Sequence, residues 1–143
     1  MKTVAELTER FRNAGLRVTP QRQAVFGLLQ GVESHPTVES LYYQVVAQMP
    51  TVSMRTVYQT VHDLADLGEV RLLDVGTGAV RVDPNVEQDH HHLVCSSCGG
   101  VRDLAVEFPG VALPRQYRAG FAVDAVEVVF RGTCGECQSA ASS

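Results

Sequence analysis

The chain has 143 residues, of which 45% are hydrophobic, and it carries 12 Lys and Arg side chains against 16 Asp and Glu. This length fits one ordinary domain or two small ones, and the hydrophobic share argues against a disordered chain. No stretch approaches the roughly 20 apolar residues that span a bilayer, and the N-terminus lacks an apolar signal core, so we expect a cytoplasmic protein with no membrane partner.

The net charge of −4 is unevenly distributed along the chain. Residues 1–81 contain eight basic and eight acidic side chains, so the whole acidic excess lies in residues 82–143. Eleven of the twelve basic residues are arginine, the side chain best suited to phosphate and base-edge recognition. The overall sign of the charge therefore does not exclude a nucleic-acid-binding N-terminal half.

Capping residues, glycines and prolines divide the first part of the chain into four predicted helices. A Thr-Pro pair supplies an N-cap and an N1 proline for the second helix, and a serine caps the fourth. The expected spans are residues 4–15, 19–29, 36–50 and 53–68.

The fourth predicted helix has one apolar side and one polar side. Four polar side chains cover the side opposite the apolar one, with Tyr58 on the flank: Arg55, Gln59, His62 and Asp63. Several helices ending in such a helix suit a helix-turn-helix reader of DNA. A solvated helix face with no ligand explains the same pattern equally well.

Apolar-rich runs at residues 69–75 and 79–83, joined by Gly-Thr-Gly, predict a β-hairpin. A hairpin directly after a recognition-type helix is the wing of a winged helix. Its Arg71 and Arg81 would either contact phosphates or remain solvated. We therefore expect a winged-helix DNA-binding domain over residues 1–83 and a hinge linker over residues 84–88.

Residues 89–143 are expected to form a small α/β domain, so the predicted fold class is α+β. Strands are predicted at residues 90–95, 101–106 and 122–131, and residues 114–119 allow a short helix. A domain this small has a marginal core, which makes metal binding and dimerisation the expected supports.

Four cysteines form two CxxC pairs, Cys95 with Cys98 and Cys134 with Cys137. Disulfides are not expected in a chain without an export signal, so the spacing predicts a tetrahedral four-thiolate zinc site. Four ordinary buried thiols are the alternative. A thioredoxin-type redox motif needs only one of the pairs and leaves the other unexplained.

Three consecutive histidines, residues 90–92, precede the first cysteine pair. Alternation along a strand places His90 and His92 on one face, and Asp103 lies on the strand expected to pair with them. The complete set of candidate ligands is His35, Asp83, His90, His92 and Asp103. Three imidazoles and two carboxylates, with no thiolate, favour Fe²⁺ or Mn²⁺. A solvated histidine run, with His35 at a helix N-terminus, is the alternative interpretation.

Taken together, these motifs resemble the ferric uptake regulator family of bacterial metal-dependent repressors over nearly the whole chain. The order and spacing of the matching segments carry the resemblance: GLRVTPQR at 15–22, HPT at 35–37, VSMRTVY at 52–58, HHHLVCSSCG at 90–99 and the second CxxC pair. The resemblance implies a homodimer joined by its C-terminal domains that binds an AT-rich inverted repeat of double-stranded DNA.

The resemblance also identifies expected DNA contacts. Arg17 matches a basic residue that enters the minor groove, where narrow AT-rich DNA has enhanced negative potential. Arg55 and Tyr58 match positions on the recognition helix, and Tyr58 suits contact with a thymine methyl group. With Gln59 from the polar helix face, the expected DNA-binding residues are Arg17, Arg55, Tyr58 and Gln59.

Within the family, the five candidate ligands match the regulatory site of the peroxide-sensing branch residue by residue. Iron sensors usually carry Glu at the position of Asp83, and the last strand resembles actinobacterial members that control catalase-peroxidase. The implied protein is a repressor of oxidative-stress genes in which bound Fe²⁺ and hydrogen peroxide oxidise His35 or His90. With Mn²⁺ bound, the protein would repress transcription but respond poorly to peroxide.

The alternative within the family is an iron- or manganese-responsive repressor of metal uptake. A third metal site is not expected, because Asp89 and His91 lack the histidine of iron sensors, at whose position Val126 stands. Outside the family, a non-haem iron oxygenase fits poorly, because that class needs open coordination positions and a substrate pocket, whereas here five ligands are split across a hinge. We therefore do not expect an enzyme.

Overall fold

The computed structural model describes residues 1–32, 34–86 and 90–142. The chain divides into two compact units, Met1–Gln88 and Asp89–Ser143, and the predicted α+β class is confirmed. Part of the expected hinge, residues 87 and 88, lies outside the described residues, as does Asp89, which was considered for a third metal site.

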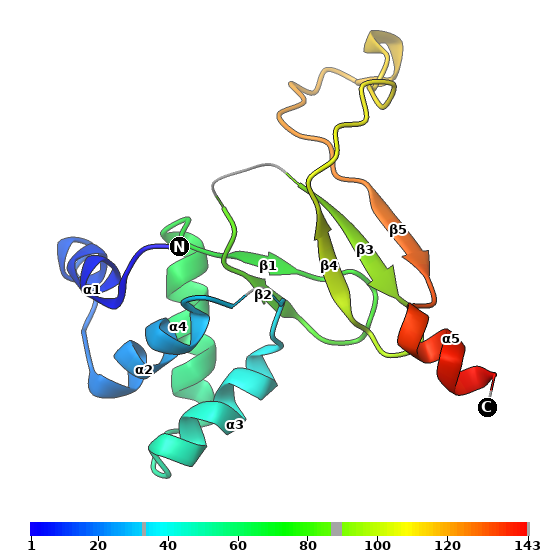
Figure 1. Cartoon of the computed structure of the whole chain (residues 1–143). Helices are drawn as coiled ribbons and strands as arrows, with labels where there is room; N and C mark the ends of the chain where they lie inside the picture. The colour runs from blue at the N-terminus through cyan, green and yellow to red at the C-terminus, as the bar shows by residue number, and fades with distance from the viewer. Residues whose placement is uncertain (33, 87–89, 143) are drawn as a thin grey trace. The chain divides into compact units, whose positions relative to one another are not determined.

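The first unit contains four helices, as predicted: α1 (Val4–Asn13), α2 (Pro20–Leu29), α3 (Val38–Gln48) and α4 (Met54–Asp66) (Figure 1). Each helix begins after a Ser or Thr whose hydroxyl accepts the backbone N–H three residues later. Such caps satisfy donors that the first helical turn leaves unpaired. The helix starts were predictable because this signal is local.

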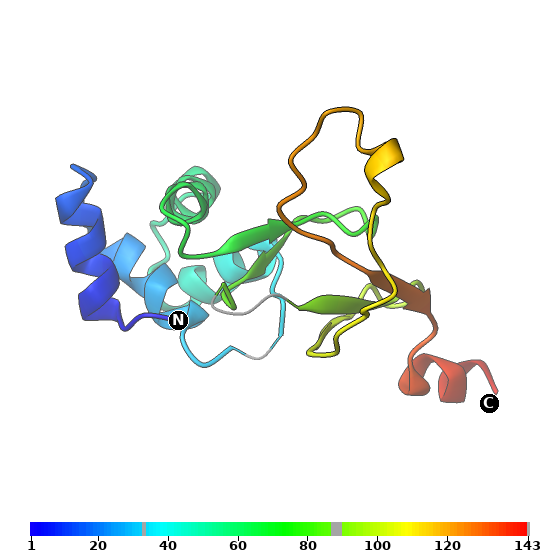
Figure 2. The ribbon, with the colours of Figure 1, turned by 90° about the horizontal axis from the view of Figure 1, so that it is seen from above.

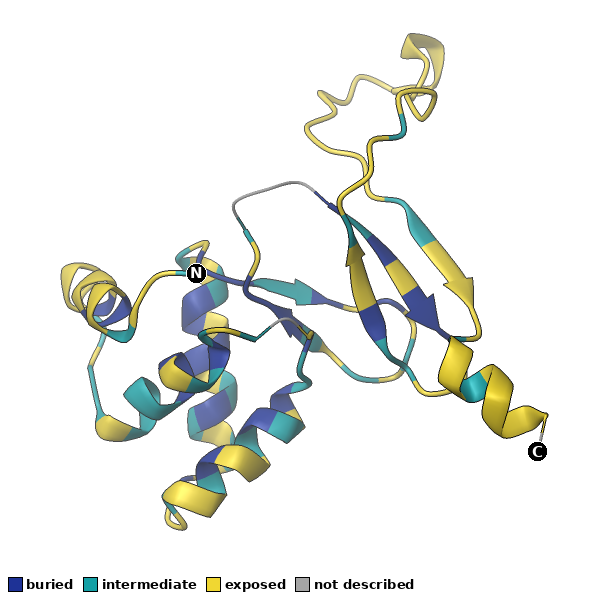
Figure 3. Cartoon of the chain, in the orientation of Figure 1, coloured by how far each residue is buried: buried dark blue, intermediate teal, exposed yellow. Residues whose placement is uncertain are grey.

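The core of the first unit is built from the inward sides of all four helices (Figure 3). Phe11 of α1 meets Phe26 of α2 edge to face, with ring centroids 4.8 Å apart. Val57, Val61 and Leu64 of α4 are completely buried against this core. The burial fixes the rotation of α4 about its axis and leaves its opposite side for other contacts.

The hairpin of the first unit pairs β1 (Arg71–Leu73) with β2 (Arg81–Asp83) in antiparallel register. The segment before α3 lies alongside β2, because the Val82 N–H donates to the carbonyl of Pro36 and Thr37 forms a bridge with Arg81. The Arg81 guanidinium donates to the His35 carbonyl at 2.8 Å, so this side chain holds the hairpin against the segment before α3. The sequence predicts either a phosphate contact or a solvated side chain for Arg81, and it does not predict this hydrogen bond.

The second unit is a three-stranded sheet followed by a helix. The central strand β3 (His91–Cys95) pairs antiparallel with β4 (Val101–Leu104) and parallel with β5 (Val129–Gly132). Helix α5 (Gly135–Ala141) follows and was not predicted. Its local signal was Cys134, which acts as the N-cap residue by accepting the N–H of Cys137.

The predicted strand over residues 122–131 is wrong for residues 122–128, since β5 begins only at Val129. Residues 105–128 instead form a long exposed excursion from the sheet, visible from two directions in Figures 1 and 2. Its only regular element among the described residues is the 3₁₀ turn η1 (Arg115–Tyr117), which falls within the short helix that the sequence allowed. Apolar residues near the end of this excursion resemble a strand in the sequence, but the described residues 122–127 have no ladder partner, and Val128 hydrogen-bonds to β3 just before β5 begins.

Candidate metal and DNA sites

The four cysteines come together at one end of the second unit. Cys95 ends β3, Cys98 lies in the following turn, and Cys134 and Cys137 stand at the start of α5. Their sulfur atoms all lie within 4.8 Å of one another. The Sγ atoms of Cys98 and Cys134 are 4.0 Å apart, close to the edge of about 3.8 Å that Zn–S bonds of about 2.3 Å give a tetrahedron. The cluster therefore fits a zinc ion.

Backbone N–H groups point at the sulfur atoms of this cluster. The N–H of Cys134 lies 3.3 Å from Cys95 Sγ, and that of Gly100 lies 3.4 Å from Cys98 Sγ. The first of these contacts is the main reason why the pKa of Cys95 falls to about 6. The pKa of Cys137 rises to about 12, chiefly through its side-chain hydrogen bond with Cys134. Because neighbouring sulfur atoms disfavour the Cys137 thiolate, a bound cation is the natural complement of the cluster.

A second group of candidate ligands lies within the first unit. His35 Nε2 is 3.5 Å from Asp83 Oδ2, and both side chains are only 1% exposed. The pairing of Val82 with Pro36 brings the two residues together, and the Asn85 N–H donates to Asp83 Oδ1 at 2.9 Å. An imidazole and a carboxylate held together away from water suit a divalent cation.

The complementary group lies on the sheet of the second unit. His92 and Asp103 are direct cross-strand partners, and Asp103 Oδ1 lies 3.1 Å from His90 Nε2 and 3.4 Å from His92 Nε2. The two imidazole centroids are 4.8 Å apart. The prediction that His90 and His92 share a face near Asp103 is therefore confirmed.

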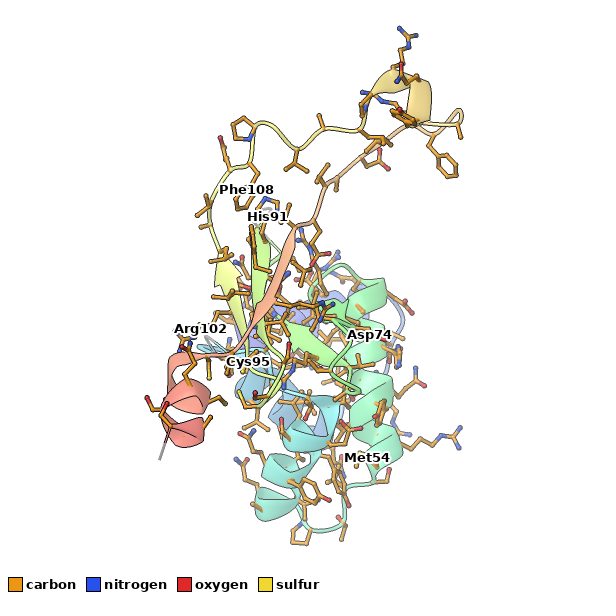
Figure 4. All side chains as sticks on the ribbon, turned by 90° about the vertical axis from the view of Figure 1, so that its right-hand side faces the viewer. Met54, Asp74, His91, Cys95, Arg102 and Phe108 are labelled. Carbon is orange, nitrogen blue, oxygen red and sulfur yellow. The ribbon has the colours of Figure 1, made fainter. Side chains whose placement is uncertain are left out.

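His91 has different surroundings from its two neighbours. Its ring packs against that of Phe108, with centroids 4.9 Å apart. Both side chains are labelled in Figure 4. Its Nδ1 accepts the N–H of Val128 at 3.0 Å. These contacts give His91 a structural role in joining β3 to the segment that leads into β5.

Sequence reasoning missed Glu127 beside the ligand group. Glu127 Oε1 lies 2.6 Å from His92 Nδ1, on the far side of the ring from Asp103. The pairing of His92 with Val129 produces this contact, since residues two apart in an extended segment share a face. Only the register between β3 and β5 reveals it.

The four predicted DNA-binding residues all lie in the first unit. Arg17 is exposed in the loop between α1 and α2, whereas Arg55, Tyr58 and Gln59 belong to the first half of α4. The Tyr58 hydroxyl donates to Glu39 at 2.6 Å. This hydrogen bond is the first cause of a raised pKa for Tyr58 and of a lowered pKa for Glu39.

Asp63 does not belong to the solvated side of α4, so that part of the predicted polar face is wrong. The residue is buried, with Arg22 Nη1 of α2 2.9 Å from its carboxylate and the Gln59 amide donating to it at 2.9 Å. A buried carboxylate is retained when a cation and hydrogen bonds compensate for its lost hydration. Arg22 supplies that compensation from α2, and the residue pattern of α4 alone does not reveal this contact.

A winged-helix unit with an arginine-bearing helix, joined to a small unit rich in metal ligands, defines a metal-binding DNA regulator. The model of the ferric uptake regulator family matches residues 13–128, and the chain belongs to this family. It is therefore a metal-responsive transcriptional repressor that binds DNA and forms dimers, and it is not an enzyme. Every helix in the described ranges is too short or too polar to cross a membrane.

Relatives with different named roles resemble the chain to a similar degree. It is 34% identical to ferric uptake regulation protein 2 of Mycolicibacterium fortuitum, with 99% of each chain covered. It is 32% identical to the peroxide-responsive repressor PerR of Staphylococcus aureus strain Mu50, over 89% of this chain and 86% of that one. A solved zinc-bound manganese uptake regulator matches with a TM-score of 0.69 and 31% identity, covering 93% of this chain and 99% of the other.

Proposed function

We propose that the protein is a peroxide-responsive repressor that holds structural zinc at its cysteines and Fe²⁺ or Mn²⁺ at a regulatory site. The observation that carries this proposal is the donor set, in which three imidazoles and two aspartates gather into two groups without a thiolate. Nitrogen and oxygen donors favour the harder first-row metals, while the separate thiolate cluster suits zinc. The chain thus offers chemically distinct places for two metals.

In this proposal, one divalent ion binds both ligand groups. His35 and Asp83 come from the first unit, and His90, His92 and Asp103 come from the second. Either group alone offers too few ligands for a tightly held ion, whereas together they supply five. Binding then favours the conformation in which the groups converge, which fixes the orientation of the DNA-binding unit.

Support for peroxide sensing comes from the relatives and from the two carboxylates. PerR of Staphylococcus aureus is among the similar proteins, and the aspartates at positions 83 and 103 follow the pattern of the peroxide-sensing branch. Fe²⁺ held by these residues would activate hydrogen peroxide, so that one peroxide oxygen is added to an imidazole and the other leaves as water. His35 and His90 present their imidazoles at this site, so oxidation of either removes a ligand and weakens the hold on DNA.

The second candidate is a repressor of metal uptake. Its specific support is the likeness to ferric uptake regulation protein 2 and to the manganese uptake regulator. Both candidates share the same DNA-binding surface. We propose that Arg17, Arg55, Tyr58 and Gln59 contact an AT-rich inverted repeat, with one half-site read by each subunit of the homodimer in the cytoplasm.

Peptide mass spectrometry after peroxide treatment separates the two candidates. Zinc-replete protein is loaded anaerobically with Fe²⁺ or Mn²⁺ and then exposed to low hydrogen peroxide. A peroxide sensor gains one oxygen atom on His35 or His90 in the Fe²⁺ sample and none in the Mn²⁺ sample. Unmodified histidines in the Fe²⁺ sample would exclude peroxide sensing and leave the metal-uptake repressor.

A further inference from the structure

The side chain of His92 lies between two carboxylates, one on β4 and one on the segment that leads into β5. Asp103 of β4 faces its Nε2 at 3.4 Å, and Glu127 faces its Nδ1 at 2.6 Å. The His92 side chain is only 3% exposed, whereas that of Glu127 is 50% exposed. A buried ring is therefore held from the solvent side by a carboxylate that belongs to none of the predicted ligand groups.

The backbone fixes the position of Glu127. Val128 makes two hydrogen bonds to β3. Its carbonyl accepts the His92 N–H at 3.0 Å, and its own N–H donates to His91 Nδ1 at 3.0 Å. These two bonds align the segment before β5 with the histidine run. The contact between Glu127 and His92 thus follows from the sheet register.

The chemistry of imidazole gives this contact a consequence. A carboxylate accepts hydrogen bonds, so a 2.6 Å contact with Nδ1 places an N–H on that nitrogen. The other nitrogen, Nε2, then offers its lone pair toward the side of the ring where Asp103 and His90 lie. Histidine ligands are commonly oriented in this way by an outer carboxylate that fixes the tautomer.

We propose that Glu127 is a positioning residue for the regulatory metal, holding His92 as an Nε2 ligand through its Nδ1–H. The inference rests on the proposed regulatory site. Glu127 does not bind the metal itself in this arrangement, because its carboxylate lies at the opposite ring nitrogen. It sets the orientation of one ligand and strengthens that ligand's electron donation.

Mn²⁺ affinity, measured from the free-ion signal in electron paramagnetic resonance, tests this role in the zinc-replete full chain. Glu127→Ala is expected to weaken Mn²⁺ binding by about 10-fold, within the range found for outer carboxylates of metal-bound histidines. Glu127→Gln is expected to weaken Mn²⁺ binding less than Glu127→Ala does, since its amide oxygen still accepts the Nδ1–H. Asp124→Asn is the matched control, because it removes one negative charge from the same exposed segment without touching His92.

A second readout needs no regulatory metal. Nitrogen-15 spectra of the metal-free regulatory site should show His92 protonated at Nδ1 in the wild type and redistributed toward Nε2 in Glu127→Ala. The inference is overturned if Glu127→Ala keeps both the wild-type tautomer and an Mn²⁺ affinity within twofold, or if Asp124→Asn weakens binding equally. If the wild type does not bind Mn²⁺, the proposed regulatory site is rejected instead. The nitrogen-15 spectra still test the contact between Glu127 and His92, because they need no bound metal.

Discussion

At the scale of single residues, Glu69 shows how a buried charge is compensated. Its carboxylate accepts hydrogen bonds from Lys2 at 2.8 Å and from Arg10 at 2.8 Å, although its side chain is only 4% exposed. Burial by itself would raise the pKa of Glu69, but the bonds from Lys2 and Arg10 bring it below its ordinary value of 4.5. The pair of cations ties α1 to the start of the hairpin.

This arrangement predicts an acid-sensitive contribution to stability. The folded state holds Glu69 ionised more strongly than the unfolded chain does, so the contribution is complete above pH 4.5 and disappears as pH falls through the lower folded pKa. Glu69→Gln should reduce the free energy of unfolding at pH 7 by about 1–2 kcal/mol. It should also flatten the fall in stability below pH 4.5, as measured by urea unfolding; an equally steep fall in the variant would refute the assignment.

The contact between Tyr58 and Glu39 carries a second prediction at this scale. Because Glu39 accepts the Tyr58 hydroxyl proton, Glu39→Ala should lower the pKa of Tyr58 toward its ordinary value of 10. Carbon-13 NMR titration of the tyrosine rings would measure this shift, with the exposed Tyr43 as internal control. A Tyr58 pKa that is unchanged in the variant would show that the hydrogen bond does not persist in solution.

At the scale of elements, local signals and the contact across the short turn between β3 and β4 were predictable, whereas contacts between elements distant in the sequence were not. The helix starts follow from capping residues that act within four positions, and the facing of His90 and His92 follows from strand alternation. Asp63 and Glu127 were missed because their partners, Arg22 and His92, come from other elements. The false strand over residues 122–128 has the same origin, since apolar composition does not reveal whether a pairing partner exists.

The cysteine cluster holds the elements of the second unit together. Few residues of this unit are buried (Figure 3). The cysteines connect the end of β3 to the start of α5. Removing zinc with a strong chelator should therefore unfold the second unit while α1–α4 persist. Hydrogen exchange followed by mass spectrometry would show loss of protection in β3, β4, β5 and α5, with protection retained in α1–α4. Retained protection in β3 after complete zinc loss would contradict a structural role for the metal.

At the scale of the whole molecule, exposed apolar side chains of the second unit indicate where dimer formation is useful. Leu93, Phe121 and Phe130 are 42%, 75% and 43% exposed in the single chain. Family members form dimers, and burial of such side chains between subunits would compensate for the small core of this unit.

The proposed joining of the two ligand groups by one metal gives a further prediction for the whole molecule. His35→Ala in the first unit and Asp103→Ala in the second should each weaken Mn²⁺ binding by more than 10-fold, because each removes one ligand from the same ion. Isothermal titration of the zinc-replete variants would measure the affinities, with His62→Ala on the exposed side of α4 as control. If only one of the two substitutions weakens Mn²⁺ binding, the ion does not bridge the units.

DNA occupancy under peroxide tests the central claim most directly. Fluorescence anisotropy would follow binding to a duplex with an AT-rich inverted repeat, using protein loaded with Fe²⁺ or with Mn²⁺, before and after low hydrogen peroxide. The proposed mechanism predicts that both forms bind, that peroxide releases the Fe²⁺ form, and that the Mn²⁺ form stays bound. An Fe²⁺ form that remains on DNA after peroxide would contradict the claim.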